Sequence, residues 1–398
     1  MAWKTMDLRE QRVRFVVAAS RREKSMTALC EEFGISRPTG LLWFKRYQQD
    51  GIAGIAERSR RPLYNPQRTS SVLEERVVAL RDHYPDWGAR KLAVLLEREG
   101  LKVPRSTVHR ILLRHDRVRP SSRRQIANSR FERSRPNELW QMDFKSPAGW
   151  DAPIGPLSVI DDHSRYLLVL QATGSTRAEL VREQLQEVFA GCGVPEGMLM
   201  DHGIPWWSAT SPTGATELTV WLMKQGIQLH WSGVRHPQTQ GKVERFHGEL
   251  ERALEHRGRQ GKPAQQWLDE FRWEHNQTRP HEALNMRTPA SVWQPSPRAF
   301  DPQPPCWEYP ADARVRRLDA DGKLHLPGHT WNISRALRRE WVQLVRLDHR
   351  MQVYYCRTLV RELDLDSHRS TAVERWLPEE SSEPKTVKDV PRQTVKDL

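Results

Sequence analysis

The sequence predicts a multidomain protein: an all-α N-terminal region with two helix-turn-helix units, an α/β core and a small C-terminal β-barrel. Three observations support this division. Apolar residues recur at helical spacing up to about residue 116, strand patterns alternate with helical patterns from Pro136, and hairpin patterns follow between residues 312 and 366. A chain of 398 residues is long enough for about two to four domains with at least one substantial core.

The charge of the chain favours a polyanionic partner. Lys plus Arg is 63 and Asp plus Glu is 50, which gives a formal net charge of +13 and a pI near 9.8. Solubility alone could also explain this excess. The four cysteines are far apart in the sequence, so neither a CxxC zinc site nor a disulfide framework is predicted. The N-terminus is polar and no apolar run reaches membrane-spanning length, so we expect a soluble intracellular protein.

Residues 1–55 predict a helix-turn-helix domain. Gly34-Ile35-Ser36 forms a tight turn between two short amphipathic helices, with Ser36 as N-cap and Pro38 in the first turn of the second helix. A plain three-helix bundle would show the same pattern, so the basic character of the second helix carries the DNA-binding interpretation. The residues of this helix that could face DNA are Arg37, Thr39, Lys45 and Arg46.

A second helix-turn-helix unit is predicted at residues 71–116, with Gly100 as a helix stop. Two such units in tandem favour DNA binding over a simple bundle. A basic linker at 56–70 precedes the unit, and an arginine-rich linker at 117–135 follows it, with seven arginines against one glutamate. Both linkers could track phosphates. The linker residues expected to contact DNA are Arg58, Arg60, Arg61, Arg123 and Arg124.

Residues 136–295 predict a mixed sheet covered by helices. In NELWQMDFK, Trp140, Met142 and Phe144 point to one side and Gln141 and Asp143 to the other. Two apolar runs around the turn 161–164 predict a hairpin, and short strands follow that end near residues 201 and 231.

Two helices of this core are predicted in more detail. STRAELVREQLQEVFAG should begin with a capping box from Thr176 to Glu179 and end at Gly191. The long helix after residue 240 should bury one apolar stripe against the sheet. This stripe consists of Val243, Phe246, Leu250 and Leu254.

The C-terminal part predicts a small β-barrel at 312–366. RVRRLDADGKLHL holds an Asp-Gly turn between short strands, and WVQLVRLDHRMQVYYC has the pattern of another hairpin. Residues 379–398 are polar and charged and predict a disordered tail. Its near-repeat of TVKDV and TVKDL is best explained by chance in a segment of simple composition.

Three carboxylates could converge at one edge of the predicted sheet. Asp143 lies within a strand among apolar neighbours, Asp201 ends a strand before Gly203, and Glu244 lies at the start of a helix beside its apolar stripe. Each has an ordinary explanation when taken alone, as a strand, turn or surface residue. Together, three hard oxygen ligands suit Mg²⁺ or Mn²⁺ rather than zinc. A pair of such ions can activate an attacking oxygen and stabilise the leaving oxygen of a phosphodiester.

The order of motifs resembles a known family. LWQMDF, MDHG and HPQTQGKVERFH resemble the D, D, E core of retroviral integrases and of the bacterial insertion-sequence transposases related to them, and FRWEHNQTRPHEALNMRTPASVW resembles the segment that closes that core. The tandem helix-turn-helix units and the joint DGIAGIAERSRRP are similar to the bacterial members. The resemblance covers most of residues 1–295. It implies an RNase H-like fold for 136–295, with Asp143, Asp201 and Glu244 as the metal ligands.

The chain departs from the family pattern at several points. His202 follows the second Asp where Asn is usual, and Gln240 stands where Asn is common. The longer second spacing is explained by a loop insertion at Ser208–Glu217, and the zinc-binding N-terminal module of retroviral integrases is missing. Asp161 and Asp162 are rival carboxylates, which we interpret as formers of the hairpin turn. We expect these departures to tune activity rather than abolish it.

The resemblance implies a bacterial transposase, associated with the nucleoid in the cytoplasm, that binds the terminal inverted repeats of its element. It would cleave the element ends and join the 3′ hydroxyls to target DNA, as a homodimer or larger homo-oligomer. Lys242 and Arg245 could contact phosphates near the scissile bond, although a solvated helix face explains them equally well. Two alternatives remain: a domesticated, non-catalytic DNA-binding regulator, and a nuclease without joining activity.

Overall fold

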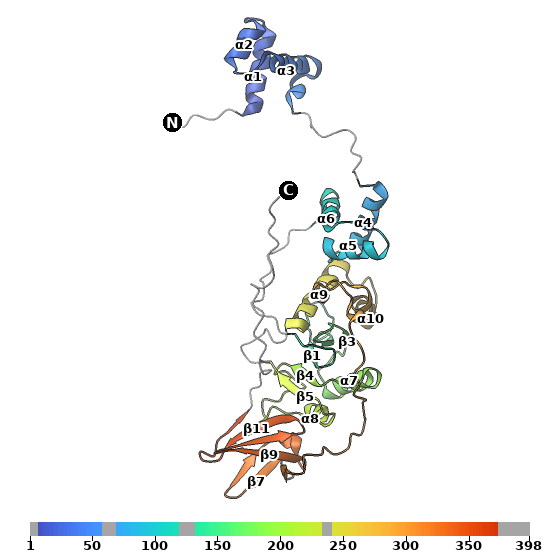
Figure 1. The fold of residues 1–398 in the computed structure, drawn as a ribbon, viewed down its shortest axis with the longest axis vertical. Coiled ribbons are helices and arrows are strands. Elements are labelled where there is room, and N and C mark those ends of the chain that lie inside the picture. Colours follow the sequence, from blue (N-terminus) through green and yellow to red (C-terminus); the bar gives the residue numbers. More distant parts are fainter. Residues whose placement is uncertain (1–6, 58–68, 119–131, 233–240, 373–398) are drawn as a thin grey trace. The chain divides into compact units, whose positions relative to one another are not determined.

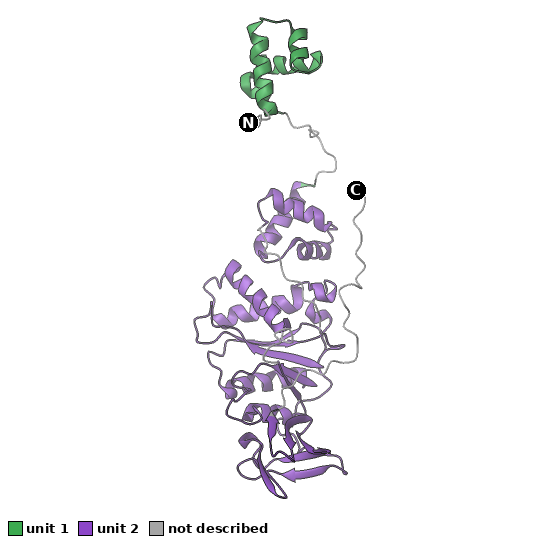
Figure 2. Ribbon diagram, turned by 90° about the vertical axis from the view of Figure 1, so that its left-hand side faces the viewer, with its two compact units in different colours: residues 1–70 green, residues 71–398 purple. Residues whose placement is uncertain are grey.

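The computed structural model describes residues 7–57, 69–118, 132–232 and 241–372. It divides the chain into two compact units, residues 1–70 and residues 71–398 (Figure 2). Within those described ranges, none of the helices is long and apolar enough to cross a membrane. The predicted tail and all five linker arginines fall outside them, so their roles stay predictions; these arginines are Arg58, Arg60, Arg61, Arg123 and Arg124.

The first unit is the predicted helix-turn-helix domain. Its elements are α1 (Leu8–Arg21), α2 (Met26–Glu32), α3 (Arg37–Asp50) and the 3-10 turn η1 (Gly51–Ile55) (Figure 1). Ser36 Oγ accepts a hydrogen bond from Thr39 N at 3.4 Å, which confirms the predicted N-cap of α3. A Cβ atom on Gly40 would lie 2.4 Å from Cys30 Sγ, so α2 and α3 pack too closely for a larger residue. The short turn and this close crossing confirm the motif.

The second helix-turn-helix domain opens the second unit. It consists of α4 (Ser71–His83), α5 (Ala89–Arg98) and α6 (Arg105–Arg114). Gly100 ends the α5 segment with φ +83°, a left-handed conformation that favours glycine and confirms the predicted stop. The three helices enclose a separate core that includes Leu92, Leu96 and Ile111.

The core is a five-stranded mixed sheet in the order β3-β2-β1-β4-β5. Its strands are β1 (Leu139–Phe144), β2 (Leu157–Asp161), β3 (Leu167–Gln171), β4 (Gly197–Met200) and β5 (Gln228–Trp231). The first three pair antiparallel, whereas β4 runs parallel to both β1 and β5. The carboxyl ends of β1 and β4 therefore reach the same edge of the sheet.

Helices cover both faces of this sheet. They are α7 (Ala178–Cys192), α8 (Glu217–Lys224), α9 (Gly241–Arg257) and α10 (Ala264–Trp273) (Figure 1). Trp140 and Met142 of β1 share a hydrophobic cluster with α7 and α8. Another cluster joins β2 and β3 to α9 and α10; the predicted stripe of α9 supplies Val243, Phe246 and Leu250, with Leu254 packed at its margin.

Both ends of α7 differ from the prediction. Arg177, not Thr176, is the N-cap and makes no side-chain cap bond, so the capping box is wrong. The helix runs to Cys192 and ends before Gly193, not at Gly191. At Gly193 φ is +75°, and a Cβ there would lie 2.6 Å from the Ser296 carbonyl oxygen. A segment distant in sequence thus selects which glycine ends the helix.

The C-terminal region forms an open sheet, not the predicted barrel. Its five-stranded sheet has the order β12-β11-β10-β9-β6, and β7 and β8 form a separate hairpin. The strands are β6 (Arg314–Arg317), β7 (Lys323–Leu326), β8 (His329–Asn332), β9 (Trp341–Leu347), β10 (Arg350–Tyr355), β11 (Thr358–Asp364) and β12 (Ser370–Ala372). In the described part of the chain, β12 and β6 are its two unpaired edges.

Packing explains why this sheet stays open. A barrel hides its inner face by pairing its first and last strands. Here the apolar face is covered from outside, because Leu344, Val353 and Leu363 join the same hydrophobic cluster as Trp331 of the hairpin and Leu222 of α8. The sheet is therefore built onto the α/β core and shares its hydrophobic interior.

Candidate active site

The fold brings the three predicted carboxylates to one edge of the core sheet. Asp143 is the fifth residue of β1, Asp201 directly follows the parallel strand β4, and Glu244 lies in the first turn of α9. The pKa of Asp143 is raised to about 7, first by burial and then by the negative charges of Asp201 and, more weakly, Glu244. Only carboxylates that lie near one another repel in this way.

The other two carboxylates act unequally on Asp143. Glu244 is mainly exposed to solvent, and its pKa is raised only by partial burial of the carboxylate. Asp201 therefore contributes more than Glu244 to the electrostatic repulsion on Asp143. All three groups are carboxylates, and the repulsion of Asp143 by its neighbours is the electrostatic condition that a divalent cation relieves. The residues present thus fit Mg²⁺ or Mn²⁺.

Asp201 is oriented by the chain that follows it. Its Oδ1 accepts hydrogen bonds from Gly203 N at 2.9 Å and from Trp206 Nε1 at 2.7 Å. A Cβ on Gly203 would lie 2.8 Å from that oxygen, so the tight approach requires glycine. The Trp206 ring is buried and stacks on Phe144, the neighbour of Asp143, with centroids 5.5 Å apart. Trp206 therefore links the two aspartates, a role that the sequence did not reveal.

His247 is a further neighbour of the site that sequence reasoning missed. It lies one helical turn after Glu244, so its spacing on α9 could have pointed to it. Its Nδ1 is 3.7 Å from Asp143 Oδ2, and its Nε2 hydrogen-bonds with Ser158 Oγ at 3.1 Å. Burial lowers the pKa of His247 to about 3, with a smaller effect from Lys145. The imidazole is therefore neutral at physiological pH.

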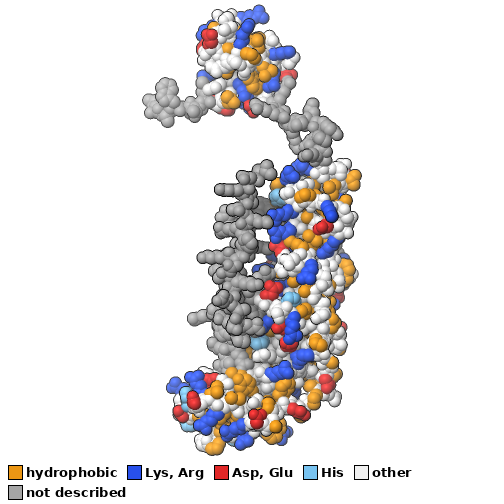
Figure 3. All heavy atoms as spheres, viewed as in Figure 1, with side chains coloured by type: hydrophobic (Ala, Val, Ile, Leu, Met, Phe, Trp, Pro, Cys, Tyr) orange, Lys and Arg blue, Asp and Glu red, His pale blue; other side chains and the backbone are white. Residues whose placement is uncertain are grey.

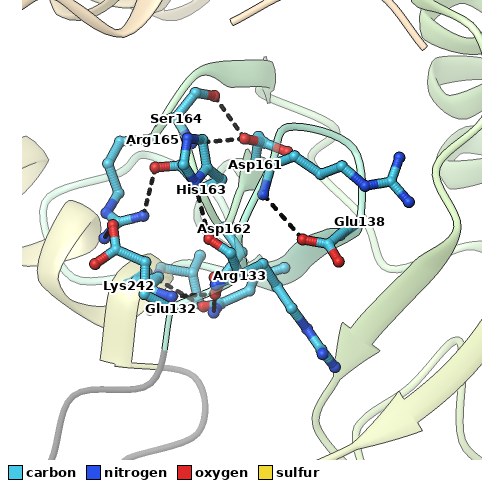
Figure 4. Close-up of polar contacts among 12 residues, drawn as sticks. Glu132, Arg133, Glu138, Asp161, Asp162, His163, Ser164, Arg165 and Lys242 are labelled. Atoms are coloured by element: carbon cyan, nitrogen blue, oxygen red, sulfur yellow. Dashed lines mark hydrogen bonds and ion pairs between the residues drawn. The ribbon is translucent and has the colours of Figure 1, made fainter. Parts of the chain in front are cut away.

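Asp161 and Asp162 are structural, but they do more than form a hairpin (Figure 4). Asp161 accepts hydrogen bonds from Ser164 N and Oγ and from Asn137 N, which closes the turn as predicted. Asp162 is fully buried and forms an ion pair with Lys242 of α9. It thereby ties the turn to the start of the helix that carries Glu244.

A glutamine of β1 completes this connection. Gln141 Nε2 donates to Asp162 Oδ1 at 2.8 Å, and Gln141 Oε1 accepts from Val243 N at 3.3 Å. Asp162 Oδ2 also accepts from Arg133 N at 2.8 Å, just after the arginine-rich linker. Asp162 and Gln141 thus hold the first turn of α9, and with it Glu244, against β1.

Comparison with known sequences supports the helix-turn-helix domains and an integrase-type core. Residues 11–62 match a helix-turn-helix domain, and residues 39–112 match a homeodomain-like domain. Residues 133–237 and 225–289 match two integrase core domains, which together span the five-stranded sheet and its helices. The chain is related to insertion-sequence transposases. Its core therefore has the RNase H-like integrase fold that the motifs implied.

Individual relatives are distant. An uncharacterized 31.7 kDa protein of insertion element IS407 from Burkholderia multivorans is 26% identical over 56% of this chain and 82% of its own length. The transposase of Tn552 from Staphylococcus aureus is 23% identical over 56% of this chain and 51% of its own length. The IS629 transposase of Shigella sonnei is 28% identical over 27% of this chain and 40% of its own length. The chain thus spans about half the length or less of these two named transposases.

Solved structures give weaker matches. The catalytic core domain of HTLV-2 integrase in complex with magnesium is 16% identical, with a TM-score of 0.32. That match covers 40% of this chain and 97% of the integrase domain.

The residues of this chain that were predicted to contact DNA are not equally exposed. Arg37 and Lys45 of α3 are exposed, and so is Arg245 of α9. By contrast, the Arg46 guanidinium lies 4.9 Å from the centre of the Trp43 ring, and Thr39 Oγ1 is within 2.8 Å of Ser36 Oγ.

Lys242 is already engaged within the protein. Its side chain is 13% exposed and pairs with Asp162. Burial lowers its pKa to about 8, against the opposing effect of Asp162. In the second helix-turn-helix domain, α6 exposes polar residues that sequence reasoning did not single out, namely Arg105, His109 and Arg110.

A second group of potential ligands joins the middle of α9 to the segment that follows α10. Single ligand atoms of Glu249, His275 and His281 lie within 4.8 Å of one another. However, Arg279 Nε is 3.2 Å from Glu249 Oε2. Burial would raise the pKa of Glu249, but the charges of Arg279 and Lys91 outweigh it and bring the pKa to about 2. Because a guanidinium already balances this carboxylate, we interpret the group as an ion-pair network rather than a metal site.

Proposed function

We propose that this chain is a DNA transposase that cleaves the ends of its insertion sequence and joins the 3′ hydroxyls to target DNA. The observation that carries the proposal is the placement of Asp143 on β1, of Asp201 at the end of the parallel strand β4 and of Glu244 in the first turn of α9, with the charges of Asp201 and Glu244 acting on Asp143. Its location in the integrase core domain supports the same chemistry.

Asp143, Asp201 and Glu244 would hold Mg²⁺ or Mn²⁺, in our proposal two ions. Such ions supply charge stabilisation to the attacking and leaving oxygens of an in-line displacement at phosphorus. Hydrolysis at the element end and strand transfer to the target are both displacements of this kind, so one site can serve both.

Other residues of the chain fix the geometry of these ligands. Trp206 and the Gly203 amide orient the Asp201 carboxylate, while neutral His247 lies against Asp143 without adding positive charge. The buried pair of Asp162 and Gln141 places α9. Preorganised ligands of this type reduce the rearrangement that metal and DNA binding would otherwise require.

The two helix-turn-helix domains would recognise the terminal inverted repeats. The exposed Arg37 and Lys45 of α3 and Arg105 and Arg110 of α6 support this role. Arg245, exposed beside Glu244, would contact phosphate near the scissile bond. Because two element ends must reach one target, the active form would be at least a homodimer.

A direct assay tests the proposal. Labelled element ends are incubated with the protein and Mg²⁺, and cleaved and joined strands are separated by electrophoresis. Asp143→Asn, Asp201→Asn and Glu244→Gln should each abolish both steps and leave end binding nearly unchanged, since binding is assigned to other domains. Glu255→Gln, an exposed carboxylate on the same helix, is the control and should stay active.

The same assay separates the alternatives. A domesticated regulator would bind ends and cut nothing even as the wild-type protein. A nuclease would release cut ends without joined products. Strand transfer by any of the three substituted proteins would refute the assignment of the carboxylates.

A further inference from the structure

The turn between α4 and α5, residues 84–88, packs against the catalytic core. At its centre lies Asp86, whose side chain is 0% exposed. Asp86 Oδ1 accepts a hydrogen bond from Arg257 Nη2 at 3.2 Å, and Oδ2 accepts one from Arg279 Nη1 at 3.0 Å. One carboxylate of the DNA-binding domain thus joins two arginines of the core.

Both arginines are also held from within the core. Arg257 makes two hydrogen bonds to the Glu274 carboxylate, at 2.6 and 2.9 Å. Arg279 Nε lies 3.2 Å from Glu249. The core therefore presents two anchored guanidinium groups side by side, and the Asp86 carboxylate fits between them. A charged group without such partners would be costly to bury here.

Aromatic residues complete the contact. Trp87 is fully buried and stacks with Tyr84 at 4.1 Å between ring centres. The Arg279 guanidinium lies 5.3 Å from the Trp87 ring, within the range of a cation–π interaction. Arg98 of α5 adds a hydrogen bond to the Thr278 carbonyl oxygen at 2.7 Å. We name the turn 84–88 with these contacts the docking turn.

The docking turn is connected to the active site through α9. Arg257 is the last residue of α9, and Glu244 lies in its first turn. The two residues are about 20 Å apart along the helix axis, at 1.5 Å per residue. The exposed residues of α6, Arg105, His109 and Arg110, make none of the docking contacts described above. The surface suited to DNA is therefore left open while its domain is fixed to the catalytic helix.

We propose that the docking turn holds the second helix-turn-helix domain at a set distance from the active site of the same chain, with Asp86 as the positioning residue. DNA bound by α6 would then be cut at one fixed spacing from the sequence that α6 contacts. The proposal rests on the proposed transposase function. It goes further, because it assigns the choice of cleavage position to an interface between domains.

The test compares full-length proteins on two DNA ends. In one DNA, about 5 base pairs, half a helical turn, are inserted between the sequence protected by α6 and the cleaved bond. The rate of specific cleavage by wild-type protein should fall at least about tenfold on the DNA that carries the insertion, because the bond is rotated away from the active site. Asp86→Ala should bind both DNAs within about threefold of wild type, cut at several positions and lose most of this discrimination.

The matched control is Asp82→Ala. Asp82, at the end of α4, is likewise an aspartate paired with an arginine, Arg117 at 2.8 Å, but this pair is exposed and lies outside the docking turn. This variant should cut at the wild-type position. Asp86→Asn keeps the size of the side chain and removes its charge, so it serves as a second variant in case Asp86→Ala misfolds. It should also cut at several positions, but to a smaller extent than Asp86→Ala.

Hydrogen exchange gives a readout that does not depend on catalysis. In Asp86→Ala the amides of residues 84–88 and 274–279 should exchange faster, whereas Asp82→Ala should leave them protected. If the wild-type protein cuts no DNA, the proposed function is refuted. Hydrogen exchange in Asp86→Ala would then still test whether Asp86 holds the two domains together. Unchanged exchange in Asp86→Ala would overturn the proposal. So would faster exchange with an unchanged cleavage position, because the contact would then be structural only.

Discussion

Asp162 illustrates how one buried side chain can hold a catalytic helix in place. Its carboxylate accepts a hydrogen bond from Gln141 and pairs with Lys242. Loss of Lys242 would leave a buried charge unbalanced, and loss of Gln141 would remove a hydrogen bond from the buried carboxylate. Breaking such a pair from one side usually costs about 3–5 kcal/mol, whereas replacing both partners by apolar residues can be nearly neutral.

We therefore expect Asp162→Asn to lower the free energy of unfolding by about 3 kcal/mol, because Lys242 stays buried without its counter-charge. Asp162→Asn combined with Lys242→Met should recover most of this loss. Urea denaturation followed by circular dichroism measures both. Independent, additive effects of the two substitutions would show that the ion pair does not hold the start of α9.

At the scale of the element, α3 divides its basic residues between two tasks. Arg37 and Lys45 are exposed, whereas Arg46 stacks on Trp43 from one side and Arg12 lies 4.1 Å from the centre of the same ring. A guanidinium that packs on a ring contributes to the fold as well as to the charge.

Arg37→Ala and Lys45→Ala should each weaken binding to an inverted-repeat duplex. Each should also reduce the slope of log affinity against log salt by about 1, because one phosphate contact is lost. Arg46→Ala should mainly lower the melting temperature. Fluorescence anisotropy over a salt series and thermal melts separate the two. Equal salt slopes for all three variants and wild type would place the DNA elsewhere.

Helix α5 carries a lysine whose charge is unfavourable in the folded state. Burial, reinforced by Arg279, lowers the pKa of Lys91 from 10.5 to about 8, against the opposing charges of Glu249, Asp86 and Glu282. Between about pH 8 and 10.5 the unfolded chain thus binds more protons than the folded one. Stability should therefore rise with pH in this window.

Lys91→Met should raise the free energy of unfolding at pH 7 by about 2 kcal/mol, since it removes the buried charge. It should also remove the rise in stability between about pH 8 and 10.5. Lys102→Met, at an exposed position of the same domain, is the control. Chemical denaturation at several pH values provides the measurement, and a destabilised Lys91→Met protein would contradict the sign of this effect.

At the scale of the whole molecule, the C-terminal sheet cannot be removed without cost to the core. The two share one hydrophobic cluster, and Lys224 of α8 pairs with Glu340 at 2.7 Å. Truncation after Pro297 would expose that cluster, so assembly must be examined with the full chain.

Full-length Glu244→Gln should form a complex that contains two element ends and at least two protein copies. The substitution stops the chemistry and preserves binding, so the paired complex should accumulate. Light scattering of the purified complex, with two DNA lengths mixed, gives its composition. Complexes that hold a single end and a single protein copy at all concentrations would disprove assembly on paired ends.

The helix-turn-helix region, the core after it and most of the core's strands and helices could be predicted from the sequence alone, and the three carboxylates stay a prediction. Alternation around Asp143, the turn at Ser36 and the apolar stripe of α9 are local patterns, and each predicts its own structure. The family resemblance implies that Asp201 and Glu244 act together with Asp143, which the spacing of the three residues alone does not determine.

Other features were decided only by tertiary structure. Gly193, not Gly191, ends α7 because the chain at Ser296 lies against it, and the C-terminal strands stay open because the core covers their apolar face. Lys242 has the sequence pattern of a DNA contact, but it is buried beside Asp162. Asp86 has no local pattern at all, since its two arginines lie 171 and 193 residues away. A charge acquires its partner only when the chain folds, and partners so distant leave no periodic signal in the sequence.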